Sequence, residues 1–350
     1  MKKKFLTKTL ILPCLLFAMA NAYEGEEYYS IAINDLSDGK TSFTSMFLGA
    51  DAGLNASASG IRNVGVGMQA LQNNTDGDRN TAIGYRSLKS NTTGGYNTAI
   101  GELSLFKNSS GVYNVAVGGK ALFANTTGNQ NVALGVSSLR GNSIGYENIA
   151  IGYKALSKNT TGAYNTANGH SVLNNNTIGS KNTAFGYKAG YSASTESGNV
   201  FIGYKAGYYA VASNKLFIEN SDSDTPLIGG DFATDKVTIN GDLIVAGTIT
   251  ELSDSRLKKD VKTLTNAIEK VNLLRGVSYE YKDDNSSSIG LIAQEVEKVL
   301  PELVSENEQG YKGVQYQNIV AVLIEAIKAQ DKQIQSLLAL HKGELKPHKH

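Results

Sequence analysis

Ser253 and Lys258 stand five residues apart in the segment Ser-Asp-Ser-Arg-Leu-Lys of this 350-residue chain. A serine hydroxyl is a weak nucleophile until a base removes its proton. A lysine side chain serves as that base only where burial or neighbouring cations favour its neutral form. Taken alone, the pair carries little weight, because Ser253-Asp254 before an apolar run is also an ordinary helix N-cap.

Paired carboxylates, the usual machinery of glycoside hydrolysis, are the second chemistry to consider. Between Asn63 and Gly203 the acidic residues form no column along the chain: Asp76, Asp78, Glu102, Glu147 and Glu196. We interpret Asp76 and Asp78 as turn residues, with weak cation binding as the alternative. A glycan-degrading spike is therefore the less favoured function, and the sequence predicts no cofactor and no metal site.

A strict repeat fills the middle of the chain. The motif Asn-x-x-x-Gly recurs every 17 residues, beginning at Asn63, Asn80, Asn97, Asn114, Asn131, Asn148, Asn165, Asn182 and Asn199. Such a period indicates a solenoid that adds one rung per repeat. A rung of this length has room for two short strands and two turns, with Asn and Gly supplying positive-φ turn positions. At ~4.8 Å per rung, the solenoid would extend roughly 40 Å.

Small residues occupy the expected core. Ala is the second residue after Asn in seven of nine rungs, and Leu stands eight positions after Asn in seven. Each rung then buries only a few apolar side chains, so association of several chains would cover the remaining apolar face. Asn168 is polar where the other rungs are apolar. We interpret it as a tolerated polar layer between chains, with ion or ligand capture as the alternative.

The rung Asn97-Thr98-Ala99-Ile100-Gly101 resembles the left-handed parallel β-roll in the heads of trimeric autotransporter adhesins, and related rungs of phage tail fibres. The resemblance covers Asn63 to about Gly207 and implies a homotrimer whose Asn-x-Ala-Ile-Gly strands face inward. An autotransporter would also carry amphipathic anchor strands at its C-terminus. The sequence near His350 does not have this pattern, so we expect no integral membrane anchor.

Three further motifs lie close together: Ser-Asp-x-Arg-Leu-Lys at Ser253, Gly-Leu-Ile-Ala-Gln-Glu-Val at Gly290 and Pro-Glu-Leu-Val at Pro301. Together they resemble the self-cleaving intramolecular chaperone of endosialidase-type tail spikes and phage tail fibres. The resemblance covers residues 252 to about 340. It implies a module that trimerises, guides folding of the β-rich body and then cuts itself off.

The resemblance to this chaperone places the nucleophile on Ser253, the catalytic lysine on Lys258 and the scissile bond between Leu252 and Ser253. The other motif residues are given supporting roles: Asp254, Arg256, Gln294 and Glu295. Two routes stay open, a serine–lysine hydrolysis and an acyl shift from nitrogen to oxygen. Either is a single turnover in cis, so we expect no activity on other substrates. A stalk that trimerises without cutting is the alternative.

Composition divides the chain into five parts: a signal peptide over 1–22, an N-terminal cap with an irregular first rung over 23–62, the β-roll over 63–213, a β stem over 214–252 and the chaperone domain over 253–350. A basic start, an apolar stretch and Ala20-Asn21-Ala22 indicate export. Charged residues number 15 of 141 between Asn63 and Gly203 but 28 of 98 from Ser253 onward. The fold class expected is mainly β with a C-terminal α+β domain.

The segments around the repeat have their own patterns. Strands are expected at 216–218 and 237–239, with a hairpin turn at Asn240-Gly241 leading to 243–245. A helical pattern runs from Val261 to Leu274. A heptad seam then predicts a short coiled coil: Val320, Leu323, Ile327, Gln330, Ile334 and Leu337.

Taken together, these features predict a secreted or cell-surface fibrous adhesin that resembles a tail fibre. Its partners would be two further copies of itself and a receptor on a host surface, either a glycan or a protein. A net charge of +1 gives no nucleic-acid signature. We therefore expect no nucleic-acid partner.

Overall fold

The computed structural model describes residues 45–57, 59–282, 285–307 and 310–344. By its internal contacts the chain divides after Ala246 into two compact units. The expected signal peptide, residues 1–22, and the start of the expected cap lie outside the described residues.

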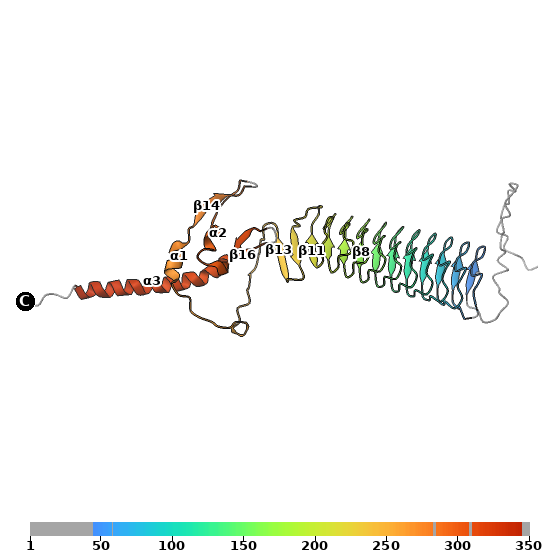
Figure 1. Ribbon diagram of the computed structural model, residues 1–350, viewed down its shortest axis with the longest axis horizontal. Coiled ribbons are helices and arrows are strands. Elements are labelled where there is room, and N and C mark those ends of the chain that lie inside the picture. The colour runs from blue at the N-terminus through green and yellow to red at the C-terminus, as the bar shows by residue number, and fades with distance from the viewer. Residues whose placement is uncertain (1–44, 58, 283–284, 308–309, 345–350) are drawn as a thin grey trace, which may run out of the picture. The chain divides into compact units, whose positions relative to one another are not determined.

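The first unit is a parallel β-solenoid, and Figure 1 shows its strands following one another along the unit. Ten three-residue strands pair in sequence order: β1 (Met46–Leu48), β2 (Val64–Val66), β3 (Thr81–Ile83), β4 (Thr98–Ile100), β5 (Val115–Val117), β6 (Val132–Leu134), β7 (Ile149–Ile151), β8 (Thr166–Asn168), β9 (Thr183–Phe185) and β10 (Val200–Ile202). Paired residues such as Thr98 and Val115 lie one 17-residue repeat apart. The predicted solenoid of 17-residue rungs is confirmed.

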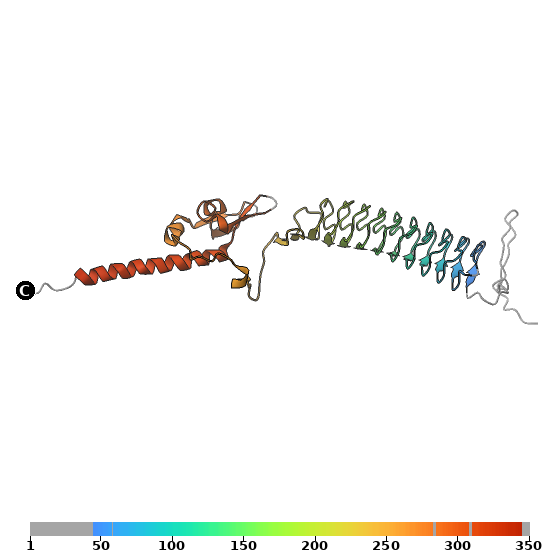
Figure 2. The same ribbon diagram turned by 60° about the horizontal axis from the view of Figure 1, so that its bottom comes forward.

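Each rung holds one strand rather than the two that we predicted, and Figure 2 shows these strands along one side of the solenoid. The other side is built from turns, because alternate residues there have a left-handed backbone. Arg86 has a φ of 55° and Leu88 a φ of 50°, whereas a strand needs extended backbone throughout. The rungs still bond to each other there, with Leu88 N donating to Ser104 O at 3.0 Å.

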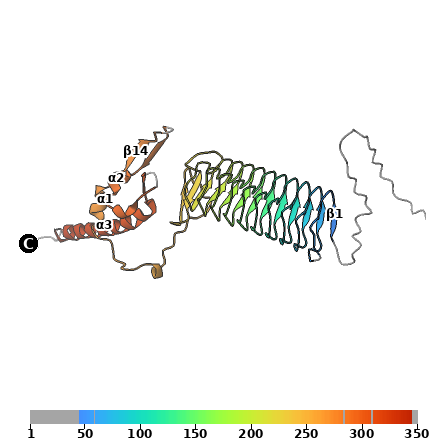
Figure 3. The ribbon, with the colours of Figure 1, turned by 45° about the vertical axis from the view of Figure 1, so that its right-hand side comes forward.

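The core of the solenoid is a narrow column formed by the middle strand residue and one leucine of each rung. Ala99 and Leu105 are both 0% exposed. The strand residues on either side of that alanine are partly exposed, as Ile100 is at 37%. We name this surface, the first and third residues of β2 to β10, the apolar strand face. Figure 3 shows the stack obliquely, with β1 at its N-terminal end.

A buried ladder of asparagine side chains links the rungs. Asn131 is 0% exposed, and its Nδ2 donates to Gly145 O at 2.9 Å and to Asn114 Oδ1 at 3.1 Å. Asn131 N donates to the same Asn114 oxygen at 3.0 Å. Because one amide offers both donors and an acceptor, each asparagine bonds to its own rung and to the rung on either side.

A second buried ladder closes the rungs: Asn74, Asn91, Asn108, Asn125, Asn142, Asn159 and Asn176. Asn125 Nδ2 donates to Asn108 Oδ1 at 2.8 Å and to Gly128 O at 2.9 Å. The prediction that asparagines supply the positive-φ turns was therefore wrong for both ladders. Burial of a hydrogen-bonding amide, rather than backbone freedom, explains asparagine at these positions.

The glycine of each motif does have the backbone that only glycine adopts easily. Gly135 has a φ of 133°, and a Cβ there would lie 2.5 Å from Gly152 O in the next rung. Positive φ and close approach of the neighbouring rung act together at this position. The glycine column therefore sets how closely the rungs stack.

The segment after the last full rung continues the sheet. β11 (Lys215–Ile218) pairs in parallel with β10, and β12 (Ile228–Asp231) and β13 (Lys236–Ile239) follow antiparallel. The strands predicted at 216–218 and 237–239 are confirmed. The hairpin predicted at Asn240-Gly241 was wrong: the turn that joins β12 to β13 lies at 232–235, and residues 243–245 form no strand. Ile244 is 92% exposed and has no neighbouring strand to pair with among the described residues.

The second unit has the α+β character that we predicted. Its elements are η2 (Ser255–Leu257), α1 (Ala267–Leu273), β14 (Val277–Glu280), β15 (Ser287–Gly290), α2 (Ala293–Val296), η3 (Pro301–Leu303), β16 (Val304–Glu306), β17 (Lys312–Val314) and α3 (Tyr316–Glu344). The helix expected from Val261 is shorter than predicted. Asp260 and Asn266 have φ values of 54° and 55°, and this left-handed backbone delays the start of α1.

Helix α3 has two apolar faces. Val322 and Ala326, at 4% and 8% exposure, pack into the core of this unit beside Val296 and Leu300. The residues of the predicted heptad seam are on the exposed part of the helix, where Ile327 is 63% exposed. One face of α3 therefore stabilises the unit, and the seam is left uncovered within it.

Candidate functional site

Ser253 and Lys258 meet near the start of the second unit. Lys258 Nζ donates a hydrogen bond to Ser253 Oγ at 2.6 Å. The short helix η2 lies between them and turns the chain, so that side chains five residues apart come within bonding distance. A lysine amine beside a serine hydroxyl is the arrangement that a nucleophile and its base require.

Asp254 and Arg256 fix the turn that joins the pair. Asp254 Oδ1 accepts from Arg256 N at 2.8 Å, so Asp254 rather than Ser253 is the N-cap of η2. Arg256 Nη2 donates to Asp254 Oδ2 at 2.7 Å. This guanidinium holds the pKa of the Asp254 carboxyl below its usual range. The charged clamp is therefore present at neutral pH and is lost only as pH falls through that lowered pKa.

An Asp254→Ala variant is expected to cleave at Leu252–Ser253 about tenfold more slowly, because a loosened turn misplaces the Ser253 hydroxyl. A time course on denaturing gels measures the rate, and size-exclusion chromatography checks that assembly is unchanged. Asp254→Asn is the matched control, since its amide oxygen can still cap η2. Cleavage of Asp254→Ala at the wild-type rate would show that the clamp does not position the serine.

The Ser253–Lys258 pair is open to solvent. Both residues are exposed, and Leu252, whose carbonyl would be attacked, is 87% exposed. A lysine acts as a base most readily where water is excluded. The single chain therefore holds the two groups in contact, and their desolvation requires a further contact.

The residues of the Gly-Leu-Ile-Ala-Gln-Glu-Val motif lie in another part of this unit. Gln294 and Glu295 belong to α2, and Glu295 Oε1 accepts from Arg275 Nη2 at 2.6 Å. This ion pair lowers the pKa of the Glu295 carboxyl. Sequence reasoning did not single out Arg275, because the partners are 20 residues apart. In the described ranges no hydrogen bond joins this motif to Ser253 or Lys258.

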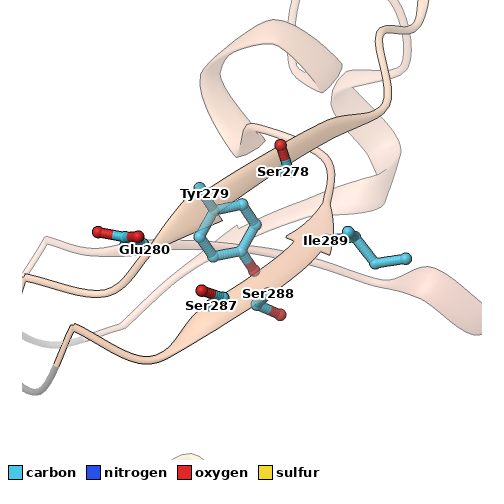
Figure 4. Close-up of a pocket in the computed structure, with 6 residues that line it drawn as sticks. All are labelled: Ser278, Tyr279, Glu280, Ser287, Ser288 and Ile289. Atoms are coloured by element: carbon cyan, nitrogen blue, oxygen red, sulfur yellow. The ribbon is translucent and has the colours of Figure 1, made fainter.

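A shallow hollow of about 710 Å³ lies on the β14–β15 hairpin, and Figure 4 shows side chains that line it. Tyr279 crosses toward Ser288 on the neighbouring strand, with Glu280 at one end and Ile289 at the other. Hydrogen bonds from Tyr281 and Ser288 lower the pKa of the Tyr279 phenol. Its lining includes neither Ser253 nor Lys258, so this hollow is not the site of the predicted cleavage.

Asp76 and Asp78 of the solenoid have partners of their own. Asp76 accepts hydrogen bonds from the hydroxyls of Ser57 and Ser59, and Asp78 pairs with Arg79 at 2.6 Å. In the described ranges no three His, Cys, Asp or Glu side chains are grouped as metal ligands would be. No described helix combines the length and the apolar character needed to cross a membrane.

The C-terminal segment matches a known family. Residues 253–305 match the family described as chaperone of endosialidase, beginning at the serine that forms the pair with Lys258. The match covers η2 through the start of β16 and includes the Gly290 and Pro301 motifs. The predicted resemblance to this chaperone is confirmed.

Curated relatives are long tail fibre proteins of phages. The chain is 34% identical over 136 residues to long tail fiber protein Gp37 of Salmonella phage S16, covering 32% of this chain and 18% of that protein. It is 37% identical over 113 residues to Gp37 of Enterobacteria phage K3, covering 28% of this chain and 9% of that protein. The chain thus spans less than a fifth of the length of these relatives, and it is similar to them in part.

Proposed function

We propose that this chain is an exported, fibre-forming adhesin similar to a tail fibre, whose C-terminal domain assembles the solenoid and then releases it. The observation that carries the proposal is the 2.6 Å contact between Lys258 Nζ and Ser253 Oγ, at the first residue of the chaperone match. The proposed parts are a signal peptide (1–22), a cap (23–62), the β-roll (63–213), a stem (214–252) and the chaperone (253–350).

Assembly would begin at α3. Its seam is apolar and exposed, with Ile327 at 63% and Leu337 at 66%, and heptad seams of this kind associate as coiled coils. We propose a homotrimer that then buries the apolar strand face of each solenoid. Tethering three chains at one end raises their local concentration and sets a common register before the rungs pair.

Cleavage would follow on Ser253. In the proposed step Lys258 takes the hydroxyl proton, and Ser253 Oγ attacks the carbonyl carbon of Leu252. The bond from that carbon to Ser253 N breaks, and the nitrogen leaves as an amine with the proton from Lys258. Leu252 is then an ester on Ser253 Oγ, and water hydrolyses it to a carboxylate. This step is the acyl shift from nitrogen to oxygen, and the alternative route, a direct serine–lysine hydrolysis of the Leu252–Ser253 bond, leaves the same two ends.

Assembly would also control when cleavage occurs. Ser253 and Lys258 are exposed in the single chain, so neighbouring chains would supply the water-poor surroundings that the lysine needs. Release of the tail removes the coiled coil after the rungs have formed. The solenoid trimer would then persist because it unfolds slowly. Chains that did unfold could not reassemble, since the tail that brings them together would be gone.

An Ile327→Glu variant of the full chain tests this function. Burying an unpaired carboxylate in the seam is unfavourable. We therefore expect the chains to associate at least about tenfold more weakly and to show little cleavage. Analytical ultracentrifugation and denaturing gels measure the two results. Gln335→Glu adds the same charge on α3 outside the seam and is expected to assemble and cleave normally.

Trimers of Ile327→Glu equal to wild type would contradict the assembly role of α3. A monomeric wild-type chain that still cleaves would contradict the coupling of cleavage to assembly. The receptor of the released fibre is proposed to be a surface glycan or protein. The fibre itself is proposed to lie outside the cell.

A further inference from the structure

Aromatic side chains gather on the last rungs of the solenoid. The residue after the motif glycine is aromatic in four successive rungs: Tyr153, His170, Tyr187 and Tyr204. Their rings stack with centroids 4.9, 5.3 and 5.4 Å apart. A second column contains Tyr191 and Tyr208, stacked at 5.1 Å. In the rungs before Tyr153, the residue after the motif glycine is aromatic only once, at Tyr85.

Lysines lie between the two columns. Lys188 Nζ is 5.3 Å from the centre of the Tyr187 ring and 5.4 Å from that of Tyr191, one in each column. Lys154, like Lys188, is the second residue after the motif glycine of its rung. Its Nζ lies 5.1 Å from the centre of the Tyr153 ring. Neither lysine is in a salt bridge with any described carboxylate, whereas Lys205 pairs with Asp222 at 3.0 Å. The stripe formed by Lys188 and the two tyrosine columns therefore carries a cation that no described carboxylate neutralises, and Lys154 is a second such cation.

The second column is interrupted, and the interruption forms a hollow of about 530 Å³. In its register Phe106 and Phe123 come first, three non-aromatic residues follow, and the aromatic residues resume at Tyr191. The three are Arg140, Ser157 and Asn174. We name this hollow the cationic hollow. Its lining includes Phe123, Arg140, Lys154, Ser157, Lys158 and Asn174, and all three of its charged residues are cations.

We propose that the cationic hollow and the stripe of Lys188 and the tyrosine columns bind an acidic polysaccharide, with one of its carboxylates or phosphates in the hollow. This proposal rests on the adhesin function and names its partner and site. Three cations around one recess concentrate positive potential there. Lysine ammonium groups and an arginine guanidinium are the donors that carboxylate and phosphate groups need.

The geometry favours a glycan over a nucleic acid. Proteins that hold single strands stack bases on open ring faces. Here the rings cover one another at about 5 Å, so a base has no room between them. Tyr187 and Tyr204 are still exposed to solvent. Tyrosine edges offer both apolar contact and a hydrogen-bonding hydroxyl. Such a surface suits the mixed hydroxyl and C–H surface of a sugar chain.

Calorimetric titration of the full chain with polygalacturonate, neutral dextran and single-stranded DNA tests the proposal. Lys154→Gln/Lys158→Gln is expected to weaken polygalacturonate binding about tenfold or more through lost charge attraction. Lys89→Gln/Lys120→Gln removes the same charge elsewhere on the solenoid and is expected to bind as wild type does. Ser157→Tyr fills the hollow without changing the charge and should also weaken polygalacturonate binding. Other rungs carry stacked aromatic rings at this register, so we expect the tyrosine to be accommodated.

Equal weakening by the two lysine pairs would overturn the proposal, because only net charge would then matter. Stronger binding of DNA than of polygalacturonate, equal binding of dextran, or no saturable binding by wild type would also overturn it. A phosphate-bearing glycan that outcompetes polygalacturonate would support the site and identify phosphate as its group. Denaturing gels of the same samples separate the two proposals: retained binding without cleavage contradicts the chaperone alone, and cleavage without binding contradicts the site alone.

Discussion

Replacing Ser253 with alanine is expected to leave the chain whole, whereas we expect the wild-type chain to separate into the solenoid and a 98-residue fragment that begins at Ser253. The hydroxyl is the proposed nucleophile, and alanine offers no atom to attack the Leu252 carbonyl. Loss of a nucleophile removes the covalent route outright, so the rate should fall by about a thousandfold or more. N-terminal sequencing of gel bands from purified protein measures the result.

Two further variants separate the chemistry from folding. Lys258→Arg keeps the positive charge but has no neutral form to accept a proton, so it should assemble and remain whole. Ser253→Cys keeps a nucleophile, and hydroxylamine should trap its thioester with Leu252. A wild-type chain that stays intact after assembly, or a Ser253→Ala chain that cuts at the same bond, would exclude the proposed mechanism. The C-terminal unit would then be a permanent trimerisation domain.

An Asn131→Ala variant should destabilise the solenoid strongly. Asn131 Oδ1 accepts from Asn148 N and Asn148 Nδ2, both at 3.1 Å, and its Nδ2 serves Gly145 O. Alanine leaves these buried groups without partners, at about 1–3 kcal/mol for each group. We expect the free energy of unfolding of the solenoid to fall by about 3 kcal/mol or more, as measured by urea unfolding followed by circular dichroism.

The end of the same ladder provides the control. Asn199 Nδ2 finds no acceptor among the described residues, and Asn199 Oδ1 accepts from Lys215 N at 2.8 Å. Asn199→Ala therefore breaks fewer bonds than Asn131→Ala and should cost clearly less. Equal losses at the two positions would mean that the ladder contributes little and that lost side-chain volume dominates.

The repeat could be predicted from the sequence because its motif recurs at a strict interval of 17 residues. The backbone conformation and the side-chain contacts within each rung could not be predicted. Leu88 at a φ of 50° defies the usual preference of leucine, and only burial against the stacked rungs makes that conformation favourable. Asparagine likewise suggested a turn by its local preference, while its real role depends on Asn residues 17 positions before and after it.

The candidate site divides in the same way. Ser253 and Lys258 are close in sequence, so a single turn brings them together. Arg275 with Glu295, and the cationic hollow, join residues from separate turns or elements. Their side chains look like ordinary surface charge until the fold places them. A Tyr-Lys pair recurring after the motif glycine was the signal in the sequence that could have indicated the stripe.

The glycine column and the two asparagine ladders give every interior rung the same upper and lower surface. Duplicating 17 residues would therefore lengthen the solenoid by about 4.8 Å without requiring any new kind of contact. A gain or loss within the repeat that is not a multiple of 17 would move asparagines of a ladder out of register with the neighbouring rungs. Recombination between rungs can thus change the length of the solenoid in whole steps, and it can change the distance of the tyrosine and lysine rungs from β1 without disturbing the scaffold.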